Sequence, residues 1–165
     1  MRPLTEHDIR RSFVNASKGE AKRLDLPKDL ADQPWDDLDF LGWQDPGAPG
    51  RAYLIAERDE RPIGISFRVA PSATRGFTAR SMCSLCLTTR TGGGVALMTA
   101  RRSGEAGRQG NSVGQYMCVD LDCSLYVRGK KQSVAGGGLE ESLTLDEKIA
   151  RVHANLDKFL EKVTQ

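Results

Sequence analysis

The chain has 165 residues, of which 39% are hydrophobic, 28% charged and only 6% aromatic, and its formal net charge is +2. This length fits one compact unit, and the small apolar fraction favours an additional source of stability such as a metal ion. The sequence has no run of about eighteen apolar residues and no apolar stretch near its start, which argues against membrane spanning and secretion and predicts a cytoplasmic protein.

The first part of the chain predicts one helix followed by a loop. Thr5, with Asp8 three residues later, has the pattern of a capping box, and apolar residues at helical spacing continue this helix to near Leu24. Residues 27–50 contain four prolines, which interrupt regular structure. We therefore expect one short helical turn and a long loop there.

A hairpin of two strands is predicted next. Residues 51–57 and 62–70 are rich in β-branched and aromatic side chains, and the polar residues 58–61 between them indicate a turn. A third strand is expected around residues 76–80, and it leads into the first pair of cysteines.

The central part predicts a second pair of strands. Residues 87–94 form a Gly-rich turn, and residues 95–102 and 112–118 are expected to be strands. Residues 103–111 between them are predicted to be a flexible basic loop.

Two helices are predicted after these strands. Apolar residues at helical spacing within residues 119–130 indicate a short helix that begins at the second cysteine pair, with Gly129 as its stop. Residues 133–142 contain three successive glycines and are predicted to be a linker. Thr144 and Glu147 form a capping box for an amphipathic terminal helix.

Four cysteines form two close pairs. Cys83 and Cys86 are separated by two residues, thirty-one residues follow, and Cys118 and Cys123 are separated by four. Thiolates at such spacings can close a tetrahedral cage around a structural zinc ion, and the order of knuckle, hairpin and helix is that of a treble-clef zinc finger. A redox pair made of Cys83 and Cys86, or four unrelated buried thiols, are the alternatives.

The sequence gives almost no support to an enzyme. The Gly-rich turn lacks the Gly-Lys-Ser/Thr ending of a phosphate-binding loop, and no nucleophile elbow or zinc-protease motif occurs. Asp36, Asp37 and Asp39 are interpreted as capping and solvated residues, and the two histidines, His7 and His153, are far from the cysteines in sequence. We therefore expect a binding protein.

The basic residues gather in one part of the chain. Between residues 75 and 131, nine basic residues accompany three acidic ones, which gives +6 and leaves −4 for the remainder. A zinc ion held by four thiolates would lower this +6 to about +4. A basic face favours an acidic partner, either nucleic acid or an acidic protein surface; a merely solvated face is the alternative.

The segment SLYVRGKK, residues 124–131, is the strongest candidate for a binding surface. It lies on and after the predicted metal-fixed helix, so an aromatic ring and long cations would project from a rigid base, with arginines of the predicted hairpin nearby. The same residue types suit RNA phosphates, and the alternative is that the ring packs inward while the cations are solvated. The candidate partner-binding residues are Tyr126, Arg128, Lys130, Lys131, Arg101 and Arg102.

These features together resemble the C-terminal treble-clef domain of the FusB-type family, the elongation-factor-G-binding proteins. The resemblance rests on SMCSLC, a glycine-containing hairpin, GNSVGQYMCVDLDCSLYVRGK and the terminal amphipathic helix, and it covers about residues 5–163. It implies that the zinc ligands are Cys83, Cys86, Cys118 and Cys123. Better-known resistance proteins of the family also carry an N-terminal helical bundle, most of which this chain lacks, so a housekeeping role in translation is expected.

The resemblance also implies partners and activity. It predicts a non-enzymatic protein with one structural zinc ion that binds elongation factor G and promotes its release from the ribosome, with an effect on fusidic acid sensitivity. Elongation factor G and the ribosome are the expected partners, with contact to ribosomal RNA and without a small-molecule substrate. The alternative is a zinc-ribbon-like protein that binds ribosomal RNA.

The predicted fold is α+β, with antiparallel strands and a treble-clef-type four-cysteine zinc site flanked by N-terminal and C-terminal helices. Residues 1–74 are expected to form the N-terminal helix and the strand hairpin. Residues 75–165 are expected to form the zinc-binding domain with its C-terminal helix, and the two parts are expected to pack as one compact unit.

Overall fold

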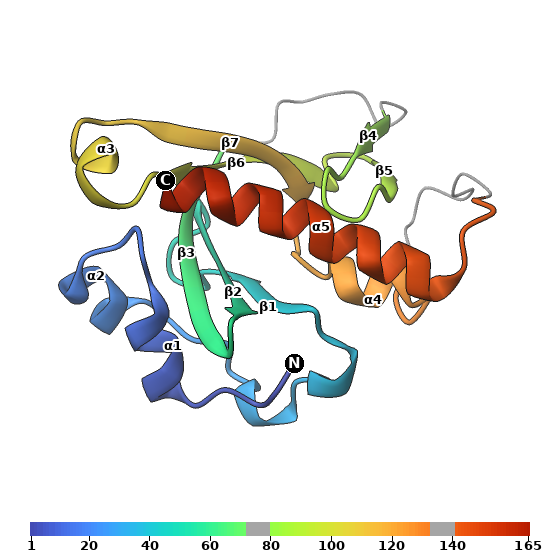
Figure 1. Ribbon diagram of the computed structural model, residues 1–165, viewed down its shortest axis with the longest axis horizontal. Helices are drawn as coiled ribbons and strands as arrows, with labels where there is room; N and C mark the ends of the chain where they lie inside the picture. The colour runs from blue at the N-terminus through green and yellow to red at the C-terminus, as the bar shows by residue number, and fades with distance from the viewer. Residues whose placement is uncertain (72–79, 133–140) are drawn as a thin grey trace.

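A five-stranded antiparallel sheet in the order β1-β2-β3-β6-β7 forms the centre of the computed structural model, which describes residues 1–71, 80–132 and 141–165. Figure 1 shows the long helix α5, Leu145–Thr164, running across the sheet, while two short N-terminal helices lie beside β3. The strands are β1 Phe40–Gln44, β2 Arg51–Arg58, β3 Arg61–Val69, β6 Val95–Arg101 and β7 Ser112–Cys118. The predicted α+β fold with antiparallel strands is confirmed.

The N-terminal segment forms two helices, so the prediction of a single helix to near Leu24 is wrong. Helix α1, Glu6–Ser12, begins at the predicted capping box of Thr5 and Asp8. A second capping box, formed by Ser17 and Glu20, starts α2, Lys18–Arg23. Between the helices Phe13 is extended and bridges to Gly64 of β3, so pairing with the sheet outweighs the helical spacing of the apolar residues.

The segment predicted to be a turn and a long loop contains the edge strand β1. Two 3-10 turns, Leu30–Asp32 and Trp35–Asp37, precede it. The strand then pairs with β2 over its whole length, from Phe40 opposite Ala56 to Gln44 opposite Ala52. The prolines on either side set its limits but do not prevent the pairing. The predicted helical turn is present, but the prediction of a long loop is wrong where β1 forms.

The predicted hairpin of β2 and β3 is confirmed. Its turn consists of Asp59 and Glu60, whose φ angles of 49° and 59° are typical of a tight two-residue turn that matches strand twist. The predicted strands β6 and β7 are also confirmed as antiparallel neighbours. The predicted loop between them contains one short helix, α3, Gly104–Arg108.

Two predicted segments lie wholly or partly outside the described residues. Residues 76–79 of the third predicted strand and residues 133–140 of the predicted linker belong to this group. Next to the first gap, β4, Arg80–Met82, pairs with β5, Thr89–Thr91, to form a separate two-stranded ribbon.

Both predicted C-terminal helices are confirmed. Helix α4, Cys123–Val127, begins at the second cysteine pair, and Gly129 follows it with a φ of 68°, a conformation that glycine adopts without strain. Helix α5 begins at the capping box of Thr144 and Glu147.

Each face of the sheet has its own core. On one face α5 packs over the sheet, where Phe159 stacks on Phe67 of β3 at 5.7 Å between ring centres. On the other face the N-terminal segment packs on β1 and β2, and the ring of Phe13 meets that of Tyr53 edge-on. All four cysteines belong to the first core, so the metal site is continuous with the packing of α5.

The sheet joins β3 to β6 across the predicted division at residues 74 and 75, which falls outside the described residues. The division into residues 1–74 and 75–165, expected to pack as one compact unit, stays a prediction. Among the helices that the structure describes, none is both long and apolar enough to cross a bilayer.

Candidate metal centre

Three segments bring the four cysteine side chains together. Cys83 and Cys86 lie in the tight turn that links β4 to β5, and this turn is closed by the amide of Leu87, which donates to the Cys83 carbonyl at 2.9 Å. Cys118 is the last residue of β7, and Cys123 is the first residue of α4. A knuckle therefore supplies two sulfurs, while a strand end and a helix start supply the others.

The geometry of the four sulfurs fits one zinc ion. All four side chains are buried, and their Sγ atoms lie within 4.8 Å of one another. The Sγ atoms of Cys83 and Cys123 are 3.6 Å apart, and those of Cys86 and Cys118 are 3.7 Å apart. A tetrahedron with zinc–sulfur bonds of about 2.3 Å requires sulfurs about 3.8 Å apart, whereas a disulfide requires about 2.0 Å.

Contacts among the four thiols shift their pKa values in opposite directions. Hydrogen bonds from Cys118 lower the pKa of Cys83 and of Cys86, whereas the sulfur of Cys118, together with its neighbours, raises the pKa of Cys123. Four buried thiolates would repel one another strongly, so they cannot coexist without a compensating positive charge. Zinc supplies that charge, and because the four thiolates fill its coordination shell, the ion is structural.

The knuckle is held in place by backbone groups. The amide of Ser84 donates to the carbonyl of Tyr116 in β7 at 2.8 Å. From α5, the side-chain amide of Asn155 donates to the carbonyl of Leu85 at 3.0 Å. The knuckle is thus fixed between the edge of the main sheet and the long helix, which makes this end of the molecule rigid.

An ionic cluster lies against Tyr126, on the helix that carries Cys123. The Tyr126 hydroxyl donates to the Asp120 carboxylate at 2.6 Å. The guanidinium of Arg90 lies over the Tyr126 ring, 4.6 Å from its centre, and forms an ion pair with the same carboxylate. Burial, followed by the hydrogen bond to Asp120, raises the pKa of Tyr126 to about 12. The ring of Tyr126 is buried, and the cations of Arg90 and Lys131 lie over it.

The other cations of this end are also paired with carboxylates. Arg128 forms a two-pronged ion pair with Asp39, Lys130 pairs with Asp37, and Lys131 pairs with Asp120 and Asp122. Lys130 and Lys131 remain 54% and 41% exposed, whereas Arg128 is only 14% exposed. The role of these residues towards a partner stays a prediction.

The structure does not bring Arg101 and Arg102 to this end. In the hairpin of β6 and β7, the metal ligand Cys118 lies opposite Val95 at one end, and Arg101 lies opposite Ser112 at the other end. From Val95 to Arg101 the strand advances six residues, which corresponds to roughly 20 Å. The six candidate residues therefore belong to two separate surfaces.

Three side chains of this end, Asp39, Arg90 and Asp120, were not among the residues predicted from the sequence to form a site. Asp39, interpreted as a solvated residue, is buried, and that interpretation is wrong. Asp120 could have been found from its place between the two last cysteines. Nothing in the neighbouring sequence distinguishes Arg90 or Asp39 from other charged residues, because their partners are distant in the chain.

Comparison with known proteins gives one match. A family model described as the FBP C-terminal treble-clef zinc-finger covers residues 8–163. No curated protein and no solved structure matches the chain. The family match and the cluster of four buried sulfurs together confirm the predicted treble-clef fold with one structural zinc ion.

Proposed function

Because the chain belongs to the FBP C-terminal treble-clef zinc-finger family, the FusB-type family, we propose that it binds elongation factor G and promotes the release of this factor from the ribosome. The observation that carries the proposal is that the family match spans residues 8–163 and includes the complete four-cysteine site. Translation is cytoplasmic, and we place the action of the protein there.

The proposed mechanism needs no chemical step. A zinc ion held by the four cysteines would fix the knuckle and α4 as one rigid unit. A binding protein can displace the factor only if it binds one conformation of that factor more tightly than the conformation that stays on the ribosome. A rigid surface suits this task, because little conformational entropy is lost when it binds.

We propose the C-terminal end of α4 and the residues that follow it as the surface for the factor. Lys130 and Lys131 are the exposed cations there, and Arg128 and Tyr126 fix the chain beneath them through Asp39 and Asp120. The cations of this end are matched by carboxylates, so the surface contributes through local ion pairs and not through net charge. When the factor binds, each exposed lysine can exchange its own carboxylate for one of the partner.

Direct binding of the two purified proteins tests the proposal. The zinc-loaded chain, freed of nucleic acid by nuclease, is expected to bind elongation factor G, and the Lys130→Glu/Lys131→Glu double variant is expected to bind it at least tenfold more weakly. Lys158→Glu is the matched control, since Lys158 is an exposed cation of α5. Absence of binding by the wild-type chain would refute the proposal.

Release is tested on the ribosome itself. With fusidic acid holding the factor on ribosomes, added wild-type chain is expected to lower the amount of factor that sediments with them, and the double variant is expected to have less effect. Binding without any loss of sedimented factor would limit the function to binding. A measurable change in fusidic acid sensitivity of cells would follow only from release.

A further inference from the structure

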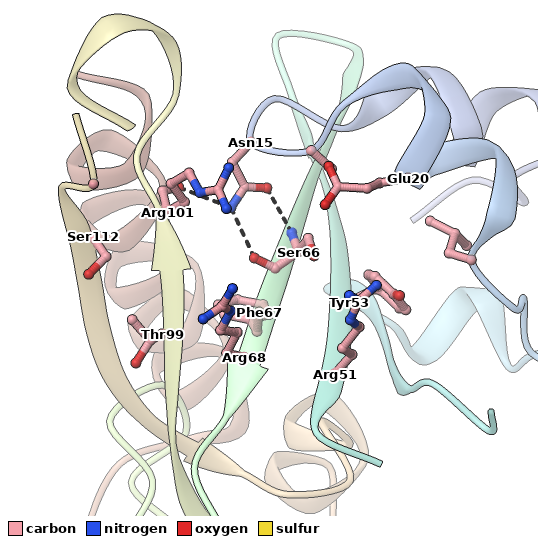
Figure 2. Close-up of a pocket in the computed structure, with 13 residues that line it drawn as sticks. Asn15, Glu20, Arg51, Tyr53, Ser66, Phe67, Arg68, Thr99, Arg101 and Ser112 are labelled. Carbon is pink, nitrogen blue, oxygen red and sulfur yellow. Dashed lines mark hydrogen bonds between the residues drawn. The ribbon is translucent and has the colours of Figure 1, made fainter. Parts of the chain in front are cut away.

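Within residues 1–71, 80–132 and 141–165, no helix covers one half of a sheet face, and this half carries arginines. The register places Arg51 of β2 opposite Arg68 of β3, Arg68 opposite Thr99 of β6, and Thr99 opposite Gly114 of β7, so these residues form a row on one face across four strands. The N-terminal helices cover the neighbouring part of this face and stop short of the row. Here lies a hollow of about 310 Å³, seen in Figure 2.

Like charges meet in this row. Directly opposed cross-strand residues have Cβ atoms only about 5 Å apart, so Arg51 and Arg68 repel each other and destabilise the sheet. Arg101, two residues beyond Thr99 on the same face, adds a third cation at a diagonal of about 7–8 Å from Arg68. Folding alone does not explain this arrangement.

These three arginines lack carboxylate partners. None of them forms an ion pair with a carboxylate in the described ranges, in contrast with the paired cations beside the metal centre. Glu20 is the one carboxylate among the described residues that line the hollow, and its charge acts on Arg101 and Arg51. Three arginines against one carboxylate leave the hollow with a net positive charge.

The wall of the hollow is preformed. The side-chain amide of Asn15 donates to the carbonyls of Ser66 and Arg101 at 2.9 and 3.0 Å, and its oxygen accepts the Ser66 amide at 2.8 Å, as Figure 2 shows. These bonds tie the segment between α1 and α2 to both β3 and β6. An anion entering here would meet guanidinium groups whose backbone positions are already set.

An exposed aromatic ring lies on the same face. Tyr116 of β7 is 46% exposed. It lies opposite Leu97 of β6, two residues further along the hairpin than the pair of Thr99 and Gly114. Between the ring and the arginines Gly114 adds no side chain, and Leu97 lies beside it, since a Cβ at Gly114 would be 3.2 Å from the Leu97 side chain. The arrangement is a row of cations beside an open aromatic platform.

We propose that this face binds single-stranded RNA, with Arg51, Arg68 and Arg101 on phosphates and Tyr116 stacked on a base. Guanidinium groups bind phosphates through paired hydrogen bonds, and an exposed ring on a sheet is the usual support for an unpaired base. The hydroxyls of Ser66, Thr99 and Ser112, which line the hollow, suit the ribose 2′-OH, which DNA lacks. This inference does not rest on the binding of elongation factor G.

Fluorescence anisotropy with a labelled single-stranded RNA of ten nucleotides tests the proposal on the zinc-loaded full chain. For the wild type, the logarithm of the association constant is expected to fall with the logarithm of salt concentration, with a slope of about −2 for three phosphates. Arg68→Ser should make this slope shallower by about 0.7, and Arg51→Ser/Arg68→Ser/Arg101→Ser should nearly abolish it. Tyr116→Ala should weaken binding at least about fivefold and leave the slope unchanged.

The controls separate this site from the metal end and from misfolding. Arg68→Ser relieves a repulsion, so its melting temperature should equal or exceed that of the wild type. Lys130→Ala/Lys131→Ala should leave RNA affinity unchanged, and DNA of the same sequence should bind more weakly than RNA. The proposal is overturned if the arginine variants bind RNA as the wild type does, if they lose elongation factor G instead, or if DNA binds equally well.

Discussion

Arg128, the residue after α4, donates two hydrogen bonds to the carboxylate of Asp39, at 2.7 and 2.9 Å, across 89 residues of chain. The backbone amide of Asp39 donates to Ser124 of α4, and His153 of α5 lies 3.0 Å from the same carboxylate. Asp39 immediately precedes the edge strand β1. This one carboxylate thus joins the far edge of the sheet to both helices of the metal-binding end.

Asp39→Asn is expected to destabilise the fold by about 3 kcal/mol, because it leaves the guanidinium of Arg128, only 14% exposed, without its charged partner. Urea unfolding at neutral pH measures the change. Asp37→Asn is the control: its partner Lys130 is 54% exposed, so the expected loss is at most about 1 kcal/mol. Equal losses in the two variants would contradict the role assigned to the buried pair.

The Asp39 pair also predicts a pH dependence. Burial raises the pKa of Asp39, but the hydrogen bond and charge of Arg128, together with His153, lower it by more, so the folded-state pKa lies below the ordinary 3.8. The stabilisation is therefore fully present above about pH 4 and is lost as the pH falls through the folded-state pKa.

The free-energy difference between the wild type and Asp39→Asn is the quantity to follow with pH. It should shrink below about pH 4, as the wild-type carboxylate takes up its proton. Loss of zinc in acid affects both proteins and cancels in the difference. A difference that grows on acidification would show that the carboxylate is not stabilised in the folded state.

Removing zinc should weaken one core and spare the other at first. The four cysteines belong to the core beneath α5, whereas the core around Tyr53 and Ile9 contains none of them. Zinc held by cysteines contributes on the order of 10 kcal/mol to folding in small domains, so a chelator should lower the melting temperature strongly. Amide hydrogen exchange is expected to rise first in β4, β5 and α4.

Cys118→Ser should lose the ion, which metal analysis would measure as a fall from one zinc per chain. Met82→Ser, a change at an exposed side chain next to Cys83, should retain it. Full zinc content and an unchanged melting temperature in Cys118→Ser would contradict the structural role. A redox pair would instead show no stoichiometric zinc and a thiol count that changes with mild oxidant.

Gly42→Ala is expected to cost about 1–3 kcal/mol and to weaken zinc binding. A Cβ at Gly42 of β1 would lie 2.5 Å from the Cβ of Leu121, a buried residue between Cys118 and Cys123. Leu121 cannot easily yield, because its backbone is already in the left-handed region with a φ of 59°. Its displacement would disturb the second cysteine pair.

Gly50→Ala is the matched control for this substitution. Nothing lies within 4 Å of the position that its Cβ would take. The free energy of unfolding and the zinc affinity of Gly50→Ala should stay close to those of the wild type. If both alanine variants behaved alike, the close approach of Leu121 to β1 would be disproved.

Local patterns in the sequence were enough for several features of the fold. The capping boxes at Thr5 and Thr144 depend on residues three apart, and the hairpin of β2 and β3 depends on neighbouring segments. The spacing of the four cysteines predicted the metal site, because two close pairs of thiolates are typical ligands of a tetrahedral structural zinc ion.

Tertiary contacts decided the remaining features. Strand β1 exists because it pairs with β2, and the first predicted helix is broken because Phe13 pairs with Gly64. The propensities of these segments are weak, so contacts with the sheet outweigh them.

The charged side chains show most clearly the difference between what the sequence predicts and what the tertiary structure decides. From the sequence alone, Arg101 and Arg128 were two cations of one basic region. In the structure Arg128 is paired with a carboxylate that is distant in the chain, beside the metal centre. Arg101 lies roughly 20 Å away along the strand, on a face that no described helix covers. The sequence determined which charges the chain carries; only the fold decided which of them are compensated, because an ion pair depends on distance in space and not on separation along the chain.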